Sequence, residues 1–122
     1  MKYVRMYADK MGDSHFEDVE VEMSLVNFAP STPPLGVSSS MPSTNIVFAD
    51  TPAGWYGEPH PVQGRLIIIY LAGEMEVTVS DGEVRRFGPG SAVLVEDTSG
   101  KGHASRAIGN DNVLAVMVFL AD

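Results

Sequence analysis

The chain has 122 residues, of which 44% are hydrophobic and 20% charged, and this fits one globular domain with a core of its own. It contains no cysteine, which excludes disulfides and thiolate metal sites, and its formal net charge of −8 argues against a nucleic-acid partner. The longest apolar run, Leu66–Ala72, is too short to cross a bilayer, and no secretory signal is recognisable. We therefore expect a cytoplasmic protein without a membrane partner.

The N-terminal part of the chain predicts one strand and a long connection. Residues Val19–Val26 alternate between apolar and polar side chains, which is typical of a half-buried strand. Proline and serine are concentrated in Phe28–Thr44, and they favour turns and extended backbone. We expect residues 1–44 to form an N-terminal arm and connection within the same domain as a body of residues 45–122. His15 precedes the predicted strand, and we expect it at the surface, unless an exchanged arm carries it to a neighbouring subunit's pocket.

Short strand-like segments, separated by Gly, Pro and Asp, make up the body. Glu74–Ser80 alternates strictly, with Met75, Val77 and Val79 on one face, and Asp81-Gly82 then predicts a hairpin turn. No segment combines helical periodicity with helix caps. The pattern predicts an all-β sandwich or barrel, a class that includes the jelly roll. The other predicted strands are Asn45–Phe48, Arg65–Leu71, Glu83–Phe87, Ser91–Val95 and Val113–Leu120.

The spacing between Gly54 and Gly73 resembles the first motif of the cupin superfamily. That motif runs Gly, five residues, His-x-His, three or four residues, Glu, six residues, Gly. Here Gly54 is followed by five residues and His60, then by Val62, by three residues and Leu66, and by six residues and Gly73. The spacing is retained, but Val62 and Leu66 stand where the family has metal ligands.

The second cupin motif, Gly, five residues, Pro-x-Gly, two residues, His, three residues, Asn, is retained in part. Gly90 is followed by five residues and then by Glu96 at the Pro position. Gly100 and His103 keep the Gly-x-x-His end after a loop that is longer by two residues, and Ala107 replaces Asn. The resemblance covers roughly the last two-thirds of the chain. It implies a cupin-type jelly-roll β-barrel (double-stranded β-helix), here with an N-terminal strand arm.

Cupins usually bind a divalent transition metal through three His and one Glu, so the resemblance raises the question of a metal. The ligand positions of the family are held here by His60, Val62, Leu66 and His103, which leaves two imidazoles. A site for Fe, Mn, Ni, Cu or Zn needs at least three converging protein donors. A metal held by His60 and His103 with an irregular third ligand, and a barrel without metal, are both open.

The loop from Glu96 to His103 is the densest polar segment of the chain. It places two carboxylates, an ammonium and an imidazole at a strand end, and loops on rigid scaffolds commonly carry chemistry. A carboxylate of Asp97 or Glu96 could orient His103, and an imidazole transfers protons near neutral pH. The candidate catalytic residues are therefore His60, His103, Asp97 and Glu96. The alternative is an exposed turn and two histidines bonded to backbone groups.

Strand parity indicates which side chains face the barrel interior. Alternate residues of a strand share a face, so His60, Leu66, Ile68 and Tyr70 should point inward. Aromatic side chains at a barrel mouth can hold a planar or apolar ligand. The candidate substrate-binding residues are Trp55, Tyr56, Gln63, Leu66, Ile68, Tyr70 and Lys101.

Three functions are compatible with these residues. The first is an isomerase, cyclase or lyase that acts on a small apolar or aromatic molecule, with His60 and His103 in acid/base chemistry. The second is a metal-dependent, dioxygenase-like cupin with irregular ligands, and the third is a non-catalytic small-molecule binding module. A pocket histidine hydrogen-bonded to Asp97 or Glu96 would favour the first.

Assembly is also implied by the resemblance. Small cupins are similar to one another in pairing through exposed sheet edges or an exchanged N-terminal strand. The strand predicted at Val19–Val26, tethered by its long connection, could be exchanged in this way. We therefore expect a homodimer.

Overall fold

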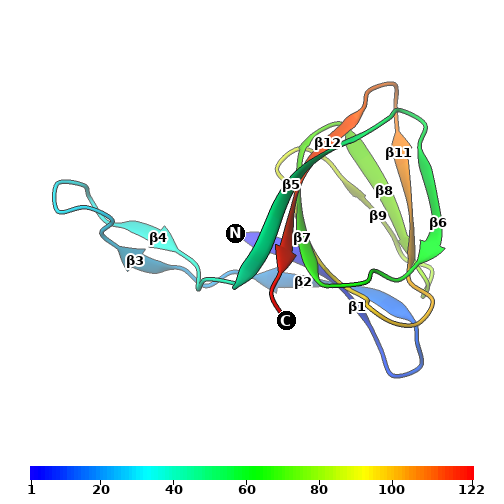
Figure 1. Cartoon of the computed structure of the whole chain (residues 1–122), viewed down its shortest axis with the longest axis horizontal. Coiled ribbons are helices and arrows are strands. Elements are labelled where there is room, and N and C mark those ends of the chain that lie inside the picture. Colours follow the sequence, from blue (N-terminus) through cyan, green and yellow to red (C-terminus); the bar gives the residue numbers. More distant parts are fainter.

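The computed structural model describes all of residues 1–122, and its strands form a barrel from which one hairpin projects (Figure 1). It contains no helix long and apolar enough to cross a membrane. The strands are β1 (Lys2–Ala8), β2 (Ser14–Glu20), β3 (Ser24–Val26), β4 (Leu35–Val37), β5 (Ser43–Thr51), β6 (Tyr56–His60), β7 (Leu66–Ala72), β8 (Glu74–Val79), β9 (Val84–Phe87), β10 (Ala92–Glu96), β11 (His103–Ile108) and β12 (Val113–Leu120).

Two sheets enclose the barrel interior. The larger sheet has the order β2-β1-β10-β7-β12-β5, and the smaller has the order β6-β11-β8-β9. The pairing of β1 with β10 is parallel, whereas the other neighbours in both sheets are antiparallel. The prediction of an all-β barrel is confirmed.

The core lies between the two sheets and follows the alternation of the strands. In β8 the side chains of Met75, Val77 and Val79 are buried, as the alternating pattern predicts, and the residues between them are partly exposed. They pack with buried residues of the larger sheet such as Val93 and Val95 of β10. This alternation orients the inward face of each strand toward one shared interior.

The N-terminal part differs from the predicted arm. The strand expected at Val19–Val26 is not formed, because β2 ends at Glu20 and β3 begins at Ser24. Residues 1–20 instead form the β1–β2 hairpin, whose β1 joins the larger sheet beside β10, so the segment that projects is shorter than residues 1–44. Local periodicity could not show this, because β1 is placed by parallel pairing with residues about ninety positions later in the chain.

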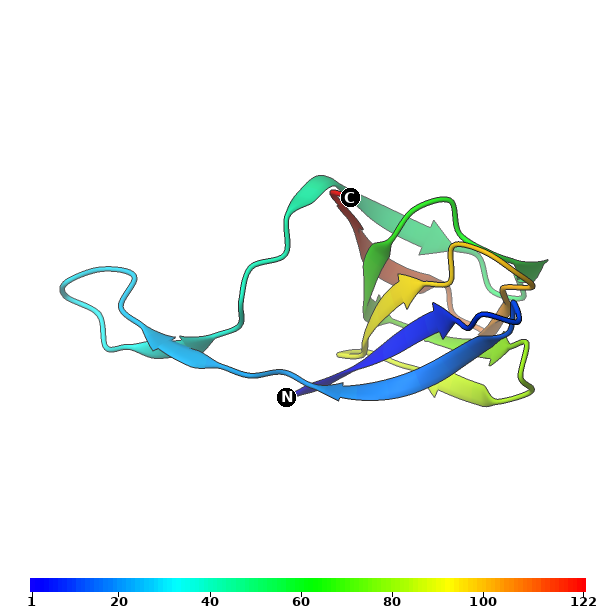
Figure 2. The ribbon, with the colours of Figure 1, turned by 90° about the horizontal axis from the view of Figure 1, so that it is seen from below.

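The projecting segment contains the β3–β4 hairpin, which has no other sheet partner. Figure 2 shows it extending away from the barrel, with both chain termini at the barrel end of the molecule. Two further strands, β6 and β11, were not among the predicted strands. They pair with each other and bring His60 opposite His103.

Candidate functional site

A cavity of about 260 Å³ opens inside the barrel between the two sheets. Eleven of its fifteen lining residues are hydrophobic, and they come from both sheets. The four others are Thr51, His60, His103 and Ser105. The cavity is therefore apolar with a few polar groups, as small-molecule sites commonly are.

Several residues predicted to bind a substrate lie in this lining. Leu66, Ile68 and Tyr70 of β7 face the cavity, and Trp55 lies beside them. Strand parity placed them correctly, although His60 reaches the cavity from a separate strand, since residues 61–65 form a loop between β6 and β7. Burial of Tyr70 raises the pKa of its hydroxyl, which therefore stays protonated and can donate a hydrogen bond.

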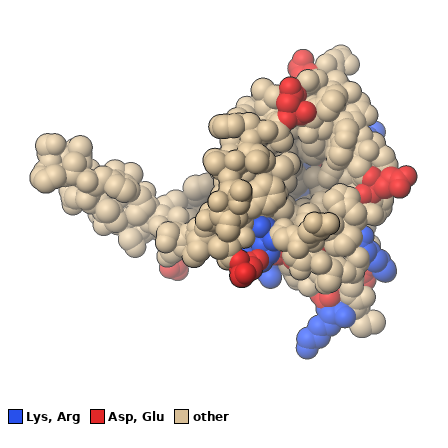
Figure 3. All heavy atoms as spheres, in the orientation of Figure 1, with Lys and Arg blue, Asp and Glu red and all other residues tan.

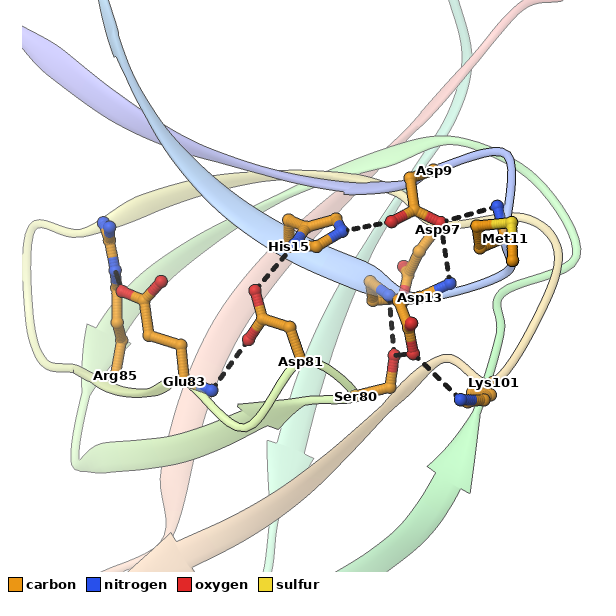
Figure 4. A network of polar contacts seen from close by, with 11 residues as sticks. Asp9, Met11, Asp13, His15, Ser80, Asp81, Glu83, Arg85, Asp97 and Lys101 are labelled. Carbon is orange, nitrogen blue, oxygen red and sulfur yellow. Dashed lines mark hydrogen bonds and ion pairs between the residues drawn. The ribbon is translucent and has the colours of Figure 1, made fainter.

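Three predicted residues lie elsewhere. Tyr56 and Gln63 are exposed and do not line the cavity. Lys101 is exposed on the outside of the barrel, where its ammonium lies 3.1 Å from a carboxylate oxygen of Asp13 (Figure 4).

His103 and Asp97 form a buried pair. The Nδ1 atom of His103 lies 2.7 Å from Oδ2 of Asp97, and the exposed fractions of the two side chains are 8% and 0%. Asp97 Oδ1 is the buried side-chain polar atom without a hydrogen-bond partner. The other ring nitrogen of His103, Nε2, makes no hydrogen bond to the protein and is not among the buried unpartnered atoms. Because the ring lines the cavity, Nε2 is accessible to a ligand there. The pair thus has the arrangement in which a carboxylate orients an imidazole.

Ser14 is a member of this group that the sequence analysis missed. Its hydroxyl donates to Oδ2 of Asp97 over 3.0 Å, and the residue is completely buried. Its own backbone N–H donates to the hydroxyl of Ser80 over 2.7 Å. Ser14 begins β2, so the N-terminal hairpin holds the carboxylate that orients His103. No sequence signal connects Ser14 to Asp97, because the contact spans the chain.

The loop between β10 and β11 is held by close backbone contacts. Gly102 has a positive φ of 75°, and a Cβ atom there would overlap the backbone of His60 and Pro61. A Cβ atom on Gly100, also at positive φ, would overlap the backbone of Gly12 in the β1–β2 turn. The backbone N–H of Lys101 donates to the Gly12 carbonyl over 2.8 Å. These contacts hold in place the loop that begins at Asp97 and leads into His103 at the start of β11.

His60 lies across the cavity rim from His103. The ring centroids are 5.3 Å apart, and His60 is exposed. Its Nδ1 lies 2.8 Å from the carbonyl oxygen of Pro61, and because a carbonyl can only accept, Nδ1 carries the proton. In both histidines the Nε2 atom is therefore the nitrogen available to a ligand.

Glu96, the other predicted acid, lies on the outside of the barrel. Its two carboxylate oxygens lie 2.5 Å from Arg5 and 2.7 Å from Arg65. Adjacent residues of a strand point to opposite faces, which separates Glu96 from the interior. It does not contact either pocket histidine and is not part of the cavity lining.

The residues at the cavity do not fit a cupin metal site. His60 and His103 offer two imidazole nitrogens, but Val62 and Leu66 line the same wall with side chains that cannot ligate. The nearest carboxylate, Asp97, already accepts hydrogen bonds from His103 and Ser14. No group of three His, Asp or Glu side chains in the chain is arranged so that it could hold a metal ion. A catalytic transition-metal site needs three protein donors, which this set lacks.

A second polar group surrounds His15 on the outside of the barrel (Figure 4). Its two ring nitrogens lie 2.5 Å from Asp9 and 2.7 Å from Asp81. The hydrogen bond with Asp9, and then that with Asp81, raises the pKa of His15. The His15 side chain joins the β1–β2 hairpin to the β8–β9 turn, and the surface position expected for His15 is correct.

The sequence analysis also missed the contribution of β12. Val113, Ala115 and Met117 line the cavity, and their spacing of two along a predicted strand was a usable signal. Ser105, two residues after His103 in β11, is placed by the same rule. Three of the four polar lining residues therefore come from β6 and β11.

Comparisons with known proteins identify the fold. No protein-family model and no curated protein matches the chain. The Cnp3 cupin domain of Schizosaccharomyces pombe matches at 18% identity with a TM-score of 0.55, over 89% of this chain and 73% of that chain. A Cupin 2 conserved barrel domain protein of Salinispora arenicola matches at 16% identity with a TM-score of 0.52, over 83% of this chain and 76% of that chain.

An enzyme is also among the matches. The DMSP lyase DddQ of Ruegeria pomeroyi is 25% identical with a TM-score of 0.55, over 83% of this chain but only 48% of that chain. Together with the barrel topology, these matches confirm the resemblance found in the glycine spacing. The protein has the cupin fold.

Proposed function

We propose that the barrel cavity binds a small apolar or aromatic molecule and that His103, oriented by Asp97, transfers a proton to or from it. The activity would be that of an isomerase, cyclase or lyase. The observation that carries the proposal is the buried Asp97–His103 pair, with an open Nε2 atom at a mainly apolar cavity.

The pair has the parts that proton transfer requires. With its Nδ1–H donated to Asp97, His103 keeps the lone pair of Nε2 directed at the ligand space and can act as a general base. The imidazolium that forms is stabilised by the adjacent carboxylate, and the apolar walls strengthen that interaction by excluding water. His60, whose Nε2 is also available, supplies a second group that can return the proton at another position, as an isomerase requires.

Two further features support this function over the alternatives. The donor set does not fit a metal-dependent, dioxygenase-like site, since Val62 and Leu66 occupy two of the family's ligand positions. The likeness to a DMSP lyase supports including lyases among the candidate activities. Tyr70, with its protonated hydroxyl, could orient a carbonyl or carboxylate of the ligand.

The proposal is tested by hydrogen–deuterium exchange at carbon. A panel of small compounds with an acidic C–H bond, including cyclohexanone, acetophenone and DMSP, is incubated with the protein in D₂O and followed by proton NMR. We expect exchange or elimination above the buffer rate for at least one compound. The rate should fall by roughly 10²- to 10⁴-fold in His103→Ala, which is the usual contribution of a positioned acid or base.

The controls separate catalysis from binding. Asp97→Asn should also lower the rate, because it removes the charge that stabilises the imidazolium, whereas Thr98→Ala, an exposed neighbour in the same loop, should not. If panel compounds shift the ring signals of His103 but none exchanges, the proton-transfer proposal is wrong and the non-catalytic binding function replaces it.

A further inference from the structure

The cavity inside the barrel is lined by no charged side chain. Its fifteen lining residues include no Asp, Glu, Lys or Arg, although 20% of the whole chain is charged. Figure 3 shows charged side chains on the outer surface, most of them on the side of the barrel away from the projecting hairpin. An ion that entered the cavity would lose its hydration without gaining an opposite charge from the lining, and this is costly. The lining therefore favours an uncharged ligand.

The polar groups of the lining are uncharged hydrogen-bond donors and acceptors. The hydroxyls of Thr51, Tyr70 and Ser105 make no hydrogen bond to the protein, and none of them is a buried atom without a partner. They are therefore free to donate to a ligand. The Nε2 atoms of His60 and His103 carry no proton in the tautomers described above, so they accept. A ligand with a carbonyl oxygen and a proton to give up would use both kinds of group.

Strand register identifies Ser105 as the free hydroxyl beside His103. Ser105 is the next inward residue of β11 after His103, one strand repeat of roughly 7 Å along the same face. Thr51 lies at the far end of the cavity, because its partner Val113 adjoins the residue that pairs with the end of β7. The Asp97–His103 pair lies near the start of β7, which pairs with the end of β10 just before Asp97. Ser105 is therefore the hydroxyl that shares both strand and face with the proposed base.

An irregularity in β6 places an aromatic ring beside Ser105. Ser105 lies two positions after His103 in β11, but its partner Gly57 lies three positions before His60, the partner of His103. The extra residue in β6 is the pattern of a β-bulge, and it shifts the parity of the strand so that Trp55 lines the cavity as His60 does. A Cβ atom on Gly57 would overlap the Trp55 ring. The indole therefore lies against the residue that pairs with Ser105, where it forms a flat apolar wall.

We propose that the ligand is an uncharged ketone or aldehyde, whose carbonyl oxygen accepts a hydrogen bond from Ser105 while the C–H bond next to the carbonyl faces Nε2 of His103. This assignment rests on the proposed proton transfer and adds the substrate class and the group that receives the developing charge. The C–H bond breaks, its proton goes to Nε2, and its electron pair moves to the carbonyl oxygen, which becomes an enolate oxygen held by Ser105. Return of a proton to carbon restores the ketone, so the step needs no further reactant.

Four matched compounds test the preference for an uncharged ligand. Acetophenone, benzamide, benzoate and benzamidine share their shape and number of non-hydrogen atoms, but the last two are ions at neutral pH. Trp55 is the single tryptophan of the chain, so its indole N–H signal in proton NMR reports binding to the cavity. We expect acetophenone and benzamide to bind, and each ion to bind at least roughly 10-fold more weakly. An ion that binds as tightly as acetophenone, or no response to acetophenone, would overturn the proposal.

The carbonyl signal of bound acetophenone tests the role of Ser105. The ligand is labelled with ¹³C at the carbonyl, because a hydrogen bond to the oxygen moves this NMR signal downfield. We expect the bound signal in Ser105→Ala to lie upfield of that in the unaltered protein, and Ser105→Thr, which keeps a hydroxyl, to restore it. Ser99→Ala, an exposed serine in the loop before β11, is the matched control and should leave the signal unchanged. Deuterium exchange at the methyl group should slow by roughly 10²- to 10³-fold in Ser105→Ala, with binding weakened far less.

Two results would overturn the role of Ser105. The first is a bound carbonyl signal that is the same in Ser105→Ala as in the unaltered protein. The second is an upfield shift caused by Tyr70→Phe and not by Ser105→Ala, which would make the phenol the donor. Both are distinct from a failure of the proposed proton transfer. If no exchange occurs but the carbonyl signal responds to Ser105→Ala, the recognition of an uncharged carbonyl compound is supported and only the proton transfer is wrong.

Discussion

The two hairpins of the N-terminal third of the chain are held in opposite ways. The β1–β2 hairpin is tied to the barrel by the pairing of β1 with β10 and by polar contacts near its turn, from Ser14 to Asp97, His15 to Asp81 and Gly12 to Lys101. The β3–β4 hairpin has no charged residue, and its two strands pair only with each other. The first hairpin is therefore part of the site, whereas the second lies outside both sheets of the barrel.

The two hairpins therefore differ in how tightly their side chains are constrained. Around Asp97 and His103 each group has a defined partner at hydrogen-bond distance, so a small change there moves the candidate catalytic groups. In the β3–β4 hairpin the apolar side chains Leu25 and Leu35 are exposed, so a change there should leave the barrel intact. The same substitution made in both regions should therefore have very different effects.

The largest difference is expected for glycine. Gly102→Ala introduces a side chain at positive φ against the backbone of His60, and we expect the free energy of unfolding to fall by about 3 kcal/mol or more. Gly36→Ala in β4 places a Cβ atom 3.3 Å from Cβ of Met23, at an ordinary φ. This substitution should change the free energy of unfolding by less than about 0.5 kcal/mol. Urea unfolding of both variants measures this, and equal effects would mean that the two regions are equally constrained.

The next largest effect is expected for Asp97. Asp97→Ala leaves the Nδ1–H of His103 and the hydroxyl of Ser14 buried without an acceptor, which should cost about 2 to 3 kcal/mol of unfolding free energy. Asp97→Asn keeps an acceptor oxygen for both donors and should cost less. Urea unfolding compares the two variants, and an Asp97→Ala protein as stable as the unaltered chain would show that the pair is not formed in solution.

The sequence predicted those parts of the fold and of the site that local patterns encode. Alternation in β8 gave the buried face, and the spacing of Leu66, Ile68 and Tyr70 gave one cavity wall. The cupin spacing brought His60 and His103 together correctly, because the glycines that space them also shape the turns. The sequence could name Asp97 only as one of two neighbouring carboxylates. The structure distinguishes them, because Asp97 points inward to His103 and Glu96 points outward to Arg5.

The parts that the sequence could not predict depend on long-range contacts. β1 is recognisable only through its parallel pairing with β10, and its own side chains do not alternate clearly. Ser14 reaches Asp97 only because β1 places the β1–β2 hairpin at that end of the barrel. In the projecting hairpin, β3 lies at the end of the strand predicted at Val19–Val26. Its partner β4 lies in the segment predicted as a connection, since the prolines and serines there indicate turns and no strand.

Ser14 offers a smaller test, of positioning. Ser14→Ala removes one of the two donors to Asp97 Oδ2 and should lower the unfolding free energy by about 1 kcal/mol. A loss of stability alone would fit a purely structural role, so the ¹⁵N chemical shifts of the His103 ring are the decisive readout. We expect a smaller share of molecules with the proton on Nδ1. Ser80→Ala, which removes the acceptor of the Ser14 backbone N–H, is the control that should leave this share unchanged.

The smallest effect is expected at His15, where the two hairpins also differ in pH dependence. Hydrogen bonds to Asp9 and Asp81 raise the pKa of His15 above its ordinary value of 6.5, so the folded protein holds this proton more tightly than the unfolded chain. The stabilisation is therefore complete below that value and is lost as pH rises through the raised pKa. The hydrogen bond from His15 lowers the pKa of Asp9, whose contribution is lost only as pH falls below its ordinary value of 3.8.

The difference in unfolding free energy between the unaltered protein and His15→Asn should consequently be widest near about pH 5 to 6 and should narrow as pH rises above about 7. Leu25→Ala in the projecting hairpin should show no such trend, because no charged residue lies between Met23 and Ala49. Urea unfolding across this pH range measures both differences. If the His15→Asn difference stays constant up to pH 9, the imidazolium does not join the β1–β2 hairpin to the barrel, and the tie between them rests on Ser14 and the backbone contacts of Gly12 alone.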